Sequence, residues 1–101
     1  MRAKPKTPER IVKDAIKLLA PHIGLRIWSI VGGLGQHPGI PDFLGVHKGR
    51  AVAIEAKAGR NKLSRYQEQF RAEWERHGGV FILARGPEDV CKALGITGVL
   101  F

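Results

Sequence analysis

The stretch GIPDFLGVHKGRAVAIEAKAG, residues 39–59, predicts the β-hairpin around which the fold is built. Two runs rich in apolar and β-branched residues, at about 41–46 and 51–57, flank the short sequence HKGR. Such runs, separated by two residues of which one is glycine, are typical of two antiparallel strands joined by a tight turn. We therefore expect a two-residue turn at Lys48 and Gly49.

This turn places two carboxylates against each other. If His47 faces Arg50, the same register brings Asp42 opposite Glu55. Lys57 lies two residues beyond Glu55 and therefore points to the same face of the strand. Like charges directly opposed on paired strands destabilise a sheet, so something must compensate them. The other face carries a core-facing apolar set: Phe43, Val52, Ile54 and Ala56.

Two kinds of compensation are open on the residues alone. The ammonium of Lys57 can form an ordinary surface ion pair. Alternatively, Asp42 and Glu55 can hold a divalent cation, because Mg²⁺ is commonly bound by one or two carboxylates together with water and phosphate oxygens. In that interpretation the backbone carbonyl of Ala56 is a further metal ligand, and Lys57 serves the attacking water or the scissile phosphate.

The charge balance indicates a polyanionic partner. Seventeen Lys and Arg residues stand against nine Asp and Glu, a formal charge of +8. The basic residues gather at 1–17 and 57–65, on both sides of the hairpin in sequence. Arg60, Lys62 and Arg65 are the best candidates for contacts to backbone phosphates. Solubility alone is the competing explanation for this charge.

Length and composition bound the class of protein. With 101 residues, 44% hydrophobic and 26% charged, the chain is expected to be a single domain over 1–101. It has no apolar run that approaches a membrane span, and its start lacks the apolar core of a signal peptide, which favours a cytoplasmic location. The lone Cys91 excludes an internal disulfide framework.

Capping residues, prolines and glycines delimit the remaining elements. The element order is then αβββαβα, an α/β fold with a mixed sheet against helices. The apolar run VFILA, bounded by glycines, favours a strand in the middle of that sheet. Helices are expected at about 8–20, 64–77 and 87–95, and further strands at 25–31 and 80–84.

The ordered motifs resemble a known pattern. "PD" at Pro41 and Asp42 followed by "EAK" at 55–57 is similar to the PD-(D/E)XK nuclease signature. Together with the glycine-containing loop before "PD", the sequence KLSRYQ, a "GG" pair and PEDV, it resembles the VRR-NUC family in its stand-alone, single-domain type. The resemblance covers roughly residues 8–95.

This resemblance implies a restriction-endonuclease-like fold and Mg²⁺- or Mn²⁺-dependent hydrolysis of phosphodiester bonds in DNA. It also implies that Glu9 and Gln67 belong to the site. Each has a structural alternative, since Glu9 suits the dipole of a first helical turn and Gln67 can form a capping box with Ser64.

Stand-alone members of the family resemble junction-resolving enzymes of DNA repair. The resemblance therefore implies a structure-selective endonuclease, a homodimer that cuts four-way (Holliday) junctions, and suits a phage or prophage. A non-catalytic, basic nucleic-acid-binding module on the same fold is the alternative.

Overall fold

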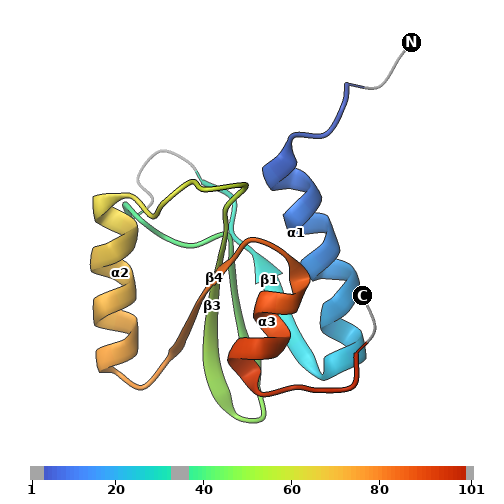
Figure 1. Ribbon diagram of the computed structural model, residues 1–101. Helices are drawn as coiled ribbons and strands as arrows, with labels where there is room; N and C mark the ends of the chain where they lie inside the picture. Colours follow the sequence, from blue (N-terminus) through green and yellow to red (C-terminus); the bar gives the residue numbers. More distant parts are fainter. Residues whose placement is uncertain (1–3, 33–36, 100–101) are drawn as a thin grey trace.

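The computed structural model of the chain describes residues 4–32 and 37–99 (Figure 1). It confirms the expected order of helices and strands and adds one short 3₁₀ helix, η1. The elements are α1 (Pro8–Leu19), η1 (Ala20–Ile23), β1 (Leu25–Ser29), β2 (Phe43–His47), β3 (Arg50–Ala56), α2 (Arg65–Arg76), β4 (Val80–Ala84) and α3 (Pro87–Leu94).

The four strands form one mixed sheet in the order β1-β2-β3-β4. β1 and β2, and β2 and β3, are antiparallel, whereas β3 and β4 are parallel. In the hairpin, His47 pairs with Arg50 and Phe43 pairs with Ile54, which confirms the predicted register. Lys48 and Gly49 both have positive φ, as a type I′ turn requires.

Capping explains where the helices begin. The Oγ1 atom of Thr7 accepts a hydrogen bond from the backbone of Arg10 at 3.1 Å, directly before Pro8 opens α1. Pro87 likewise opens α3, here after Gly86, which has no side chain to cap the helix, and Gly95 ends α3 in the left-handed conformation. These are the signals on which the sequence-based boundaries depended.

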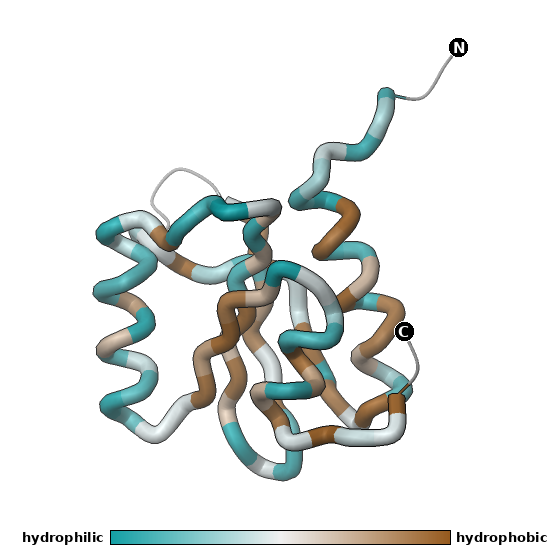
Figure 2. Tube along the Cα trace, viewed as in Figure 1, coloured by the Kyte–Doolittle hydropathy of each residue, from teal (hydrophilic) through white to brown (hydrophobic). Residues whose placement is uncertain are grey.

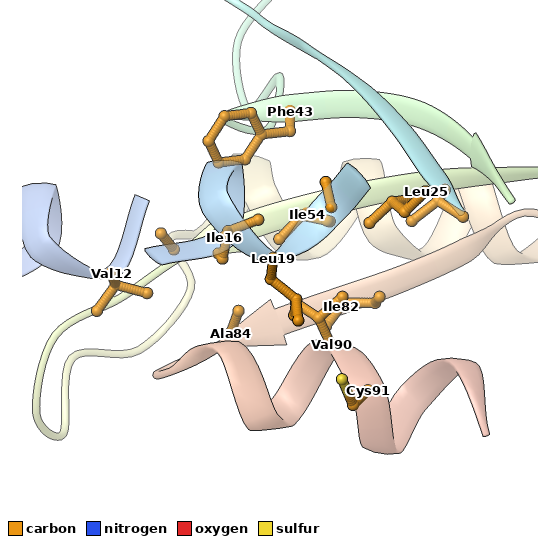
Figure 3. Packing of buried hydrophobic residues seen from close by; sticks show 13 residues of the cluster. Val12, Ile16, Leu19, Leu25, Phe43, Ile54, Ile82, Ala84, Val90 and Cys91 are labelled. Carbon is orange, nitrogen blue, oxygen red and sulfur yellow. The ribbon is translucent and has the colours of Figure 1, made fainter. Parts of the chain in front are cut away.

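Helices cover both faces of the sheet. Figure 1 shows α1 and α3 together on one side and α2 alone on the other. The main core lies between the sheet and the pair α1 and α3 (Figure 3). The predicted core-facing residues of the hairpin belong to it, each at most 1% exposed: Phe43, Val52, Ile54 and Ala56. By contrast, α2 is largely hydrophilic (Figure 2) and has no buried residue.

The expectation that 80–84 forms a strand in the middle of the sheet is wrong in one respect. The strand exists, but β4 is an edge strand, and β3 lies inside the sheet. β4 is apolar because helices cover both of its faces: Phe81 lies beside Phe70 of α2 on one side, and Val90 of α3 packs into the core on the other. An apolar strand is therefore not necessarily a central one.

Two smaller features complete the frame. β1 ends at Ser29, two residues before the predicted end, and one further backbone bond from the amide of Ile30 to the carbonyl of Asp42, at 2.8 Å, continues its pairing. Among residues 4–32 and 37–99, no helix is long and apolar enough to cross a membrane.

Candidate metal centre

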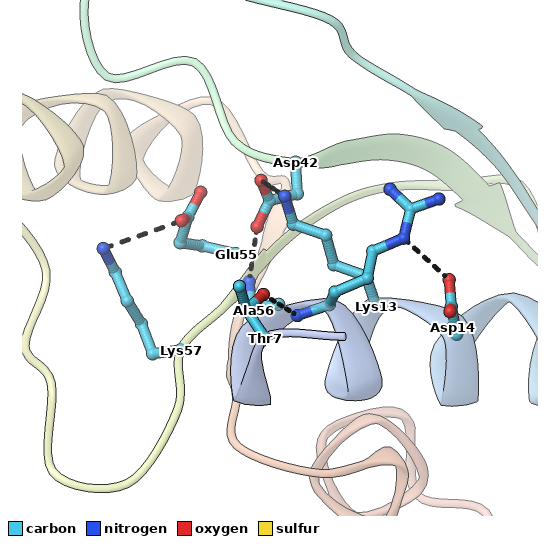
Figure 4. A network of polar contacts seen from close by, with 8 residues as sticks. Thr7, Lys13, Asp14, Asp42, Glu55, Ala56 and Lys57 are labelled. Atoms are coloured by element: carbon cyan, nitrogen blue, oxygen red, sulfur yellow. Dashed lines mark hydrogen bonds and ion pairs between the residues drawn. The ribbon is translucent and has the colours of Figure 1, made fainter. Parts of the chain in front are cut away.

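Asp42 lies directly before β2, and both of its carboxylate oxygens are engaged (Figure 4). Its Oδ2 accepts a hydrogen bond from the backbone amide of Ala56 at 2.8 Å. Its Oδ1 lies 3.1 Å from the Nζ atom of Lys13 on α1. The carboxylate is therefore held from two sides, by the end of β3 and by the first helix.

Glu55 comes from the end of β3 and is buried. Its side chain is 4% exposed, and its Oε2 lies 3.7 Å from the Nζ atom of Lys57. The pKa of Glu55 is raised to about 7, chiefly because burial disfavours the charged form. The negative charges of Asp42 and Glu9 raise the pKa further, whereas the ammonium of Lys57 opposes them.

Glu9 completes a cluster of three carboxylates. One oxygen from each of Glu9, Asp42 and Glu55 can be chosen so that all three atoms lie within 4.8 Å of one another. The three residues come from the first turn of α1, the segment before β2 and the end of β3. α1 is fixed in place because Val12 and Ile16, three and seven residues after Glu9 on the same side of the helix, pack into the core.

The donor set fits a hard divalent cation. Carboxylate oxygens are the ligands that Mg²⁺ and Mn²⁺ prefer, and converging carboxylates repel one another unless a cation or a proton compensates them. The pKa of Glu55 is raised first by burial and then by the negative charge of Asp42, so the repulsion contributes to the shift without dominating it. Glu9, Asp42 and Glu55 are thus the residues that could hold the metal ion.

Ala56 is the last residue of β3, and Lys57 directly follows it, as expected from the hairpin register. The amide of Ala56 donates to Asp42, and its carbonyl as a metal ligand stays a prediction. The backbone amide of Lys57 donates to the carbonyl of Ala84 at 3.0 Å, which continues the pairing of β3 with β4 to this residue. The Lys57 side chain is 16% exposed and borders the carboxylates.

Gln67 forms the capping box that its spacing suggested. Its side-chain Oε1 accepts a hydrogen bond from the backbone amide of Ser64 at 2.8 Å, and the backbone amide of Gln67 donates to the Ser64 Oγ at 3.2 Å. Its side-chain oxygen therefore serves the start of α2. A role for Gln67 in the site stays a prediction.

The predicted phosphate contacts lie on the segment after β3 and at the start of α2. Arg60, Lys62 and Arg65 are all exposed. The Arg85 guanidinium donates to the carbonyl of Gly59 and so holds this segment against the end of β4. Contact of the three cations with DNA stays a prediction.

Lys13 is the residue that sequence reasoning missed. It follows Glu9 by four residues on α1, so both side chains lie on the same side of the helix. That spacing was visible in the sequence, but only the fold shows that this side of α1 meets Asp42.

Comparison with solved structures places this architecture. A solved structure described as "VRR_NUC domain" matches the chain with a TM-score of 0.72 and 20% sequence identity, over 89% of this chain and 97% of the other. The fold is that of a VRR_NUC domain. No protein-family model matches the sequence, and no curated protein matches it. The VRR_NUC match confirms the expected α/β, restriction-endonuclease-like fold and supports the family resemblance drawn from "PD" and "EAK".

Proposed function

We propose that this chain is an endonuclease that hydrolyses phosphodiester bonds in DNA with Mg²⁺ or Mn²⁺. The observation that carries the proposal is the convergence of three carboxylates from three separate elements beside a lysine. The VRR_NUC fold supports it, because the name of the matching domain denotes a nuclease. The chain's charge of +8 favours a polyanionic substrate.

Asp42 and Glu55, with Glu9 and the carbonyl of Ala56, are the groups that would hold the cation. When bound there, a divalent ion lowers the pKa of a coordinated water and neutralises charge on the phosphate. The protein's part is to fix the carboxylates in advance. The Ala56 amide and the Lys13 ammonium do this for Asp42, and burial in the strand does it for Glu55.

Lys57 is the residue that would act on the reacting atoms. Hydrolysis requires water to attack the phosphorus and the bond to one bridging oxygen to break. An ammonium group next to the carboxylates can orient that water by donating a hydrogen bond to its oxygen, and can stabilise the charge that grows on the phosphate. The Nζ atom of Lys57 lies 3.7 Å from the Oε2 atom of Glu55, which supports this role.

We assign substrate binding to exposed cations on the segment after β3 and at the start of α2. Arg60, Lys62 and Arg65 follow the metal-binding strand in sequence and would contact backbone phosphates. Binding is therefore expected to weaken steeply as the salt concentration rises, because each neutralised phosphate releases counterions.

A narrower proposal concerns the substrate. Symmetric cleavage of two strands in a four-way junction needs two sites related by a two-fold axis, so the junction-resolving form of the enzyme is a homodimer. Analytical ultracentrifugation with and without a labelled four-way junction tests the dimer. A cleavage assay tests the substrate. Paired, symmetric cuts in a four-way junction support the junction-resolving homodimer, whereas cleavage of flaps or single strands alone would contradict it and leave the nuclease proposal intact.

The Lys57→Ala variant distinguishes an enzyme from a non-catalytic binding module. Labelled junction, flap, duplex and single-stranded DNA are incubated with Mg²⁺, Mn²⁺ or EDTA, and affinity is measured in parallel in EDTA. The nuclease proposal expects metal-dependent cleavage that Lys57→Ala abolishes while affinity stays nearly unchanged. Lys92→Ala, on the exposed side of α3, is the matched control and should cleave normally. Tight binding without cleavage under either metal would favour the binding module.

A further inference from the structure

A groove runs from the carboxylate centre along the junction of α1 and β1. Its first part, of about 350 Å³, is lined by α1 and by residues 29–32, and Asp42 also lines it. A second hollow of about 370 Å³ shares Lys17, Ser29 and Phe43 with the first and continues to Pro21 of η1. The two hollows therefore adjoin each other and make up one path beside α1 and β1.

The lining of this path is basic. Arg10, Lys13 and Lys17 line the first part, and Lys17 with Arg26 of β1 lines the second. The positions 10, 13 and 17 recur at helical spacing, so they form one row on α1. Asp42 is the single acidic residue in the lining that the described residues provide, and it belongs to the centre itself.

Some of these charges are already paired and others are available. Arg10 pairs with Asp14 at 3.2 Å, and Lys13 pairs with Asp42. Among the residues that the structure describes, Lys17 forms no ion pair, and the Arg26 guanidinium lies over the Trp28 ring at 4.7 Å. Both Lys17 and Arg26 are exposed.

The dimensions suit a nucleic-acid strand. From Arg10 to Lys17 the helix rises by about 10 Å, which is close to the rise of roughly three nucleotides along the axis of duplex DNA, at about 3.4 Å each for one strand. The opposite wall is tied to the centre, because Ile30 donates to the backbone carbonyl of Asp42. A strand lying in this path would reach the carboxylates directly.

We propose that this groove, lined by Arg10, Lys13, Lys17 and Arg26, binds the phosphodiester backbone of the DNA strand on one side of the cleavage site. Arg60, Lys62 and Arg65 belong to a different segment, so the substrate would be held by two separate basic surfaces. The inference rests on the proposed nuclease function, since it assigns the path by which that function's substrate reaches the centre.

Lys17→Gln tests the groove, with Lys92→Gln as the matched control for the same loss of one charge. Affinity for labelled duplex DNA is measured by fluorescence anisotropy in EDTA across a salt series, so that no cleavage takes place. The groove proposal expects Lys17→Gln to weaken binding several-fold and to reduce the slope of log Kd against log salt by about 1 relative to Lys92→Gln. An equal effect of the two variants would overturn it.

A second readout locates the contact. In an NMR titration of the wild-type chain with the same DNA, backbone amides of 29–32 and of the Arg10–Lys17 row should shift more than those of α3. Unshifted groove amides alongside shifted amides at Arg60 and Lys62 would overturn the groove while leaving the nuclease proposal untouched. Conversely, if DNA shifts the groove amides of a wild-type chain that never cleaves, the groove would be retained as a binding site and the nuclease proposal would be rejected.

Discussion

Asp42 and Glu55 occupy corresponding positions at the open end of the β2–β3 hairpin, one residue beyond the last ladder pair of Phe43 and Ile54. Their carboxylates approach each other and Glu9 closely enough to share one ion. Glu55 is buried there, and Lys57 and Lys13 each offer one positive charge. The hairpin thus brings one carboxylate from each of its two strand ends into one cluster.

The raised pKa of Glu55 predicts a stability that falls as pH rises in metal-free protein. Between its ordinary value of 4.5 and about 7 the folded chain binds a proton that the unfolded chain has lost. The protonated carboxyl is thus favoured by the fold, and its contribution, on the order of 3 kcal/mol, is lost as pH rises through this window. Thermal denaturation from pH 4 to 8 should show this decline in wild type and a much weaker one in Glu55→Gln.

Glu55→Gln should in addition be more stable than wild type above pH 7 in EDTA, because it carries no buried charge there. Identical pH profiles for the two proteins would contradict the assignment of the proton to Glu55.

Asp42→Ala and Asp42→Asn should differ in stability. The Asp42 carboxylate accepts a hydrogen bond from the backbone amide of Ala56, a fully buried residue. Asp42→Ala therefore leaves that amide without its acceptor. Such a loss costs about 1–3 kcal/mol, whereas asparagine keeps an acceptor in the same place. Urea denaturation measures the two free energies of unfolding, and equal values would show that the hydrogen bond does not hold the hairpin end.

Ser64→Ala and Gln67→Ala distinguish a cap from a site residue. Loss of an N-cap side chain costs about 1 kcal/mol, so Ser64→Ala should lower the free energy of unfolding. If Gln67 acts only in the capping box, cleavage by Gln67→Ala should match that of Ser64→Ala. A cleavage defect in Gln67→Ala alone, at equal stability, would place Gln67 in the site.

Gly39→Ala should be among the most destabilising small substitutions. Gly39 has φ +81°, and an added Cβ atom would collide with the backbone carbonyl of Tyr66 at the start of α2. We expect a loss of about 2 kcal/mol or more, since the left-handed backbone and the backbone collision both oppose it. Gly32→Ala is the control and should change the melting temperature little, because the added Cβ atom meets no atom of the described residues within 4 Å.

Much of this architecture was predictable because the signals are local. The side chains of Thr7 and Ser64 cap α1 and α2, and Pro8 and Pro87 occupy the first positions of α1 and α3. None of these signals needs a tertiary contact. The turn at 48–49 fixed the hairpin register, and with it the meeting of Asp42 and Glu55.

Other features depended on contacts that the sequence does not display. β4 is apolar although it lies at the edge, because helices cover both of its faces, and such a covered edge strand has the same composition as a central one. The contact of Lys13 with Asp42 requires the packing of α1 on the sheet, so no local pattern could reveal it. Assignment of Glu9 to the site came from family resemblance, and the fold now gives it a geometric basis.

Mn²⁺ binding is the measurement that tests the metal centre most directly. Isothermal titration calorimetry of the wild-type chain at pH 8, with Asp42→Asn alongside, needs no knowledge of the DNA substrate. Saturable Mn²⁺ binding that Asp42→Asn weakens by at least tenfold is the expected result. Absence of binding by wild type, or equal binding by the variant, would contradict the claim that Glu9, Asp42 and Glu55 form a metal centre.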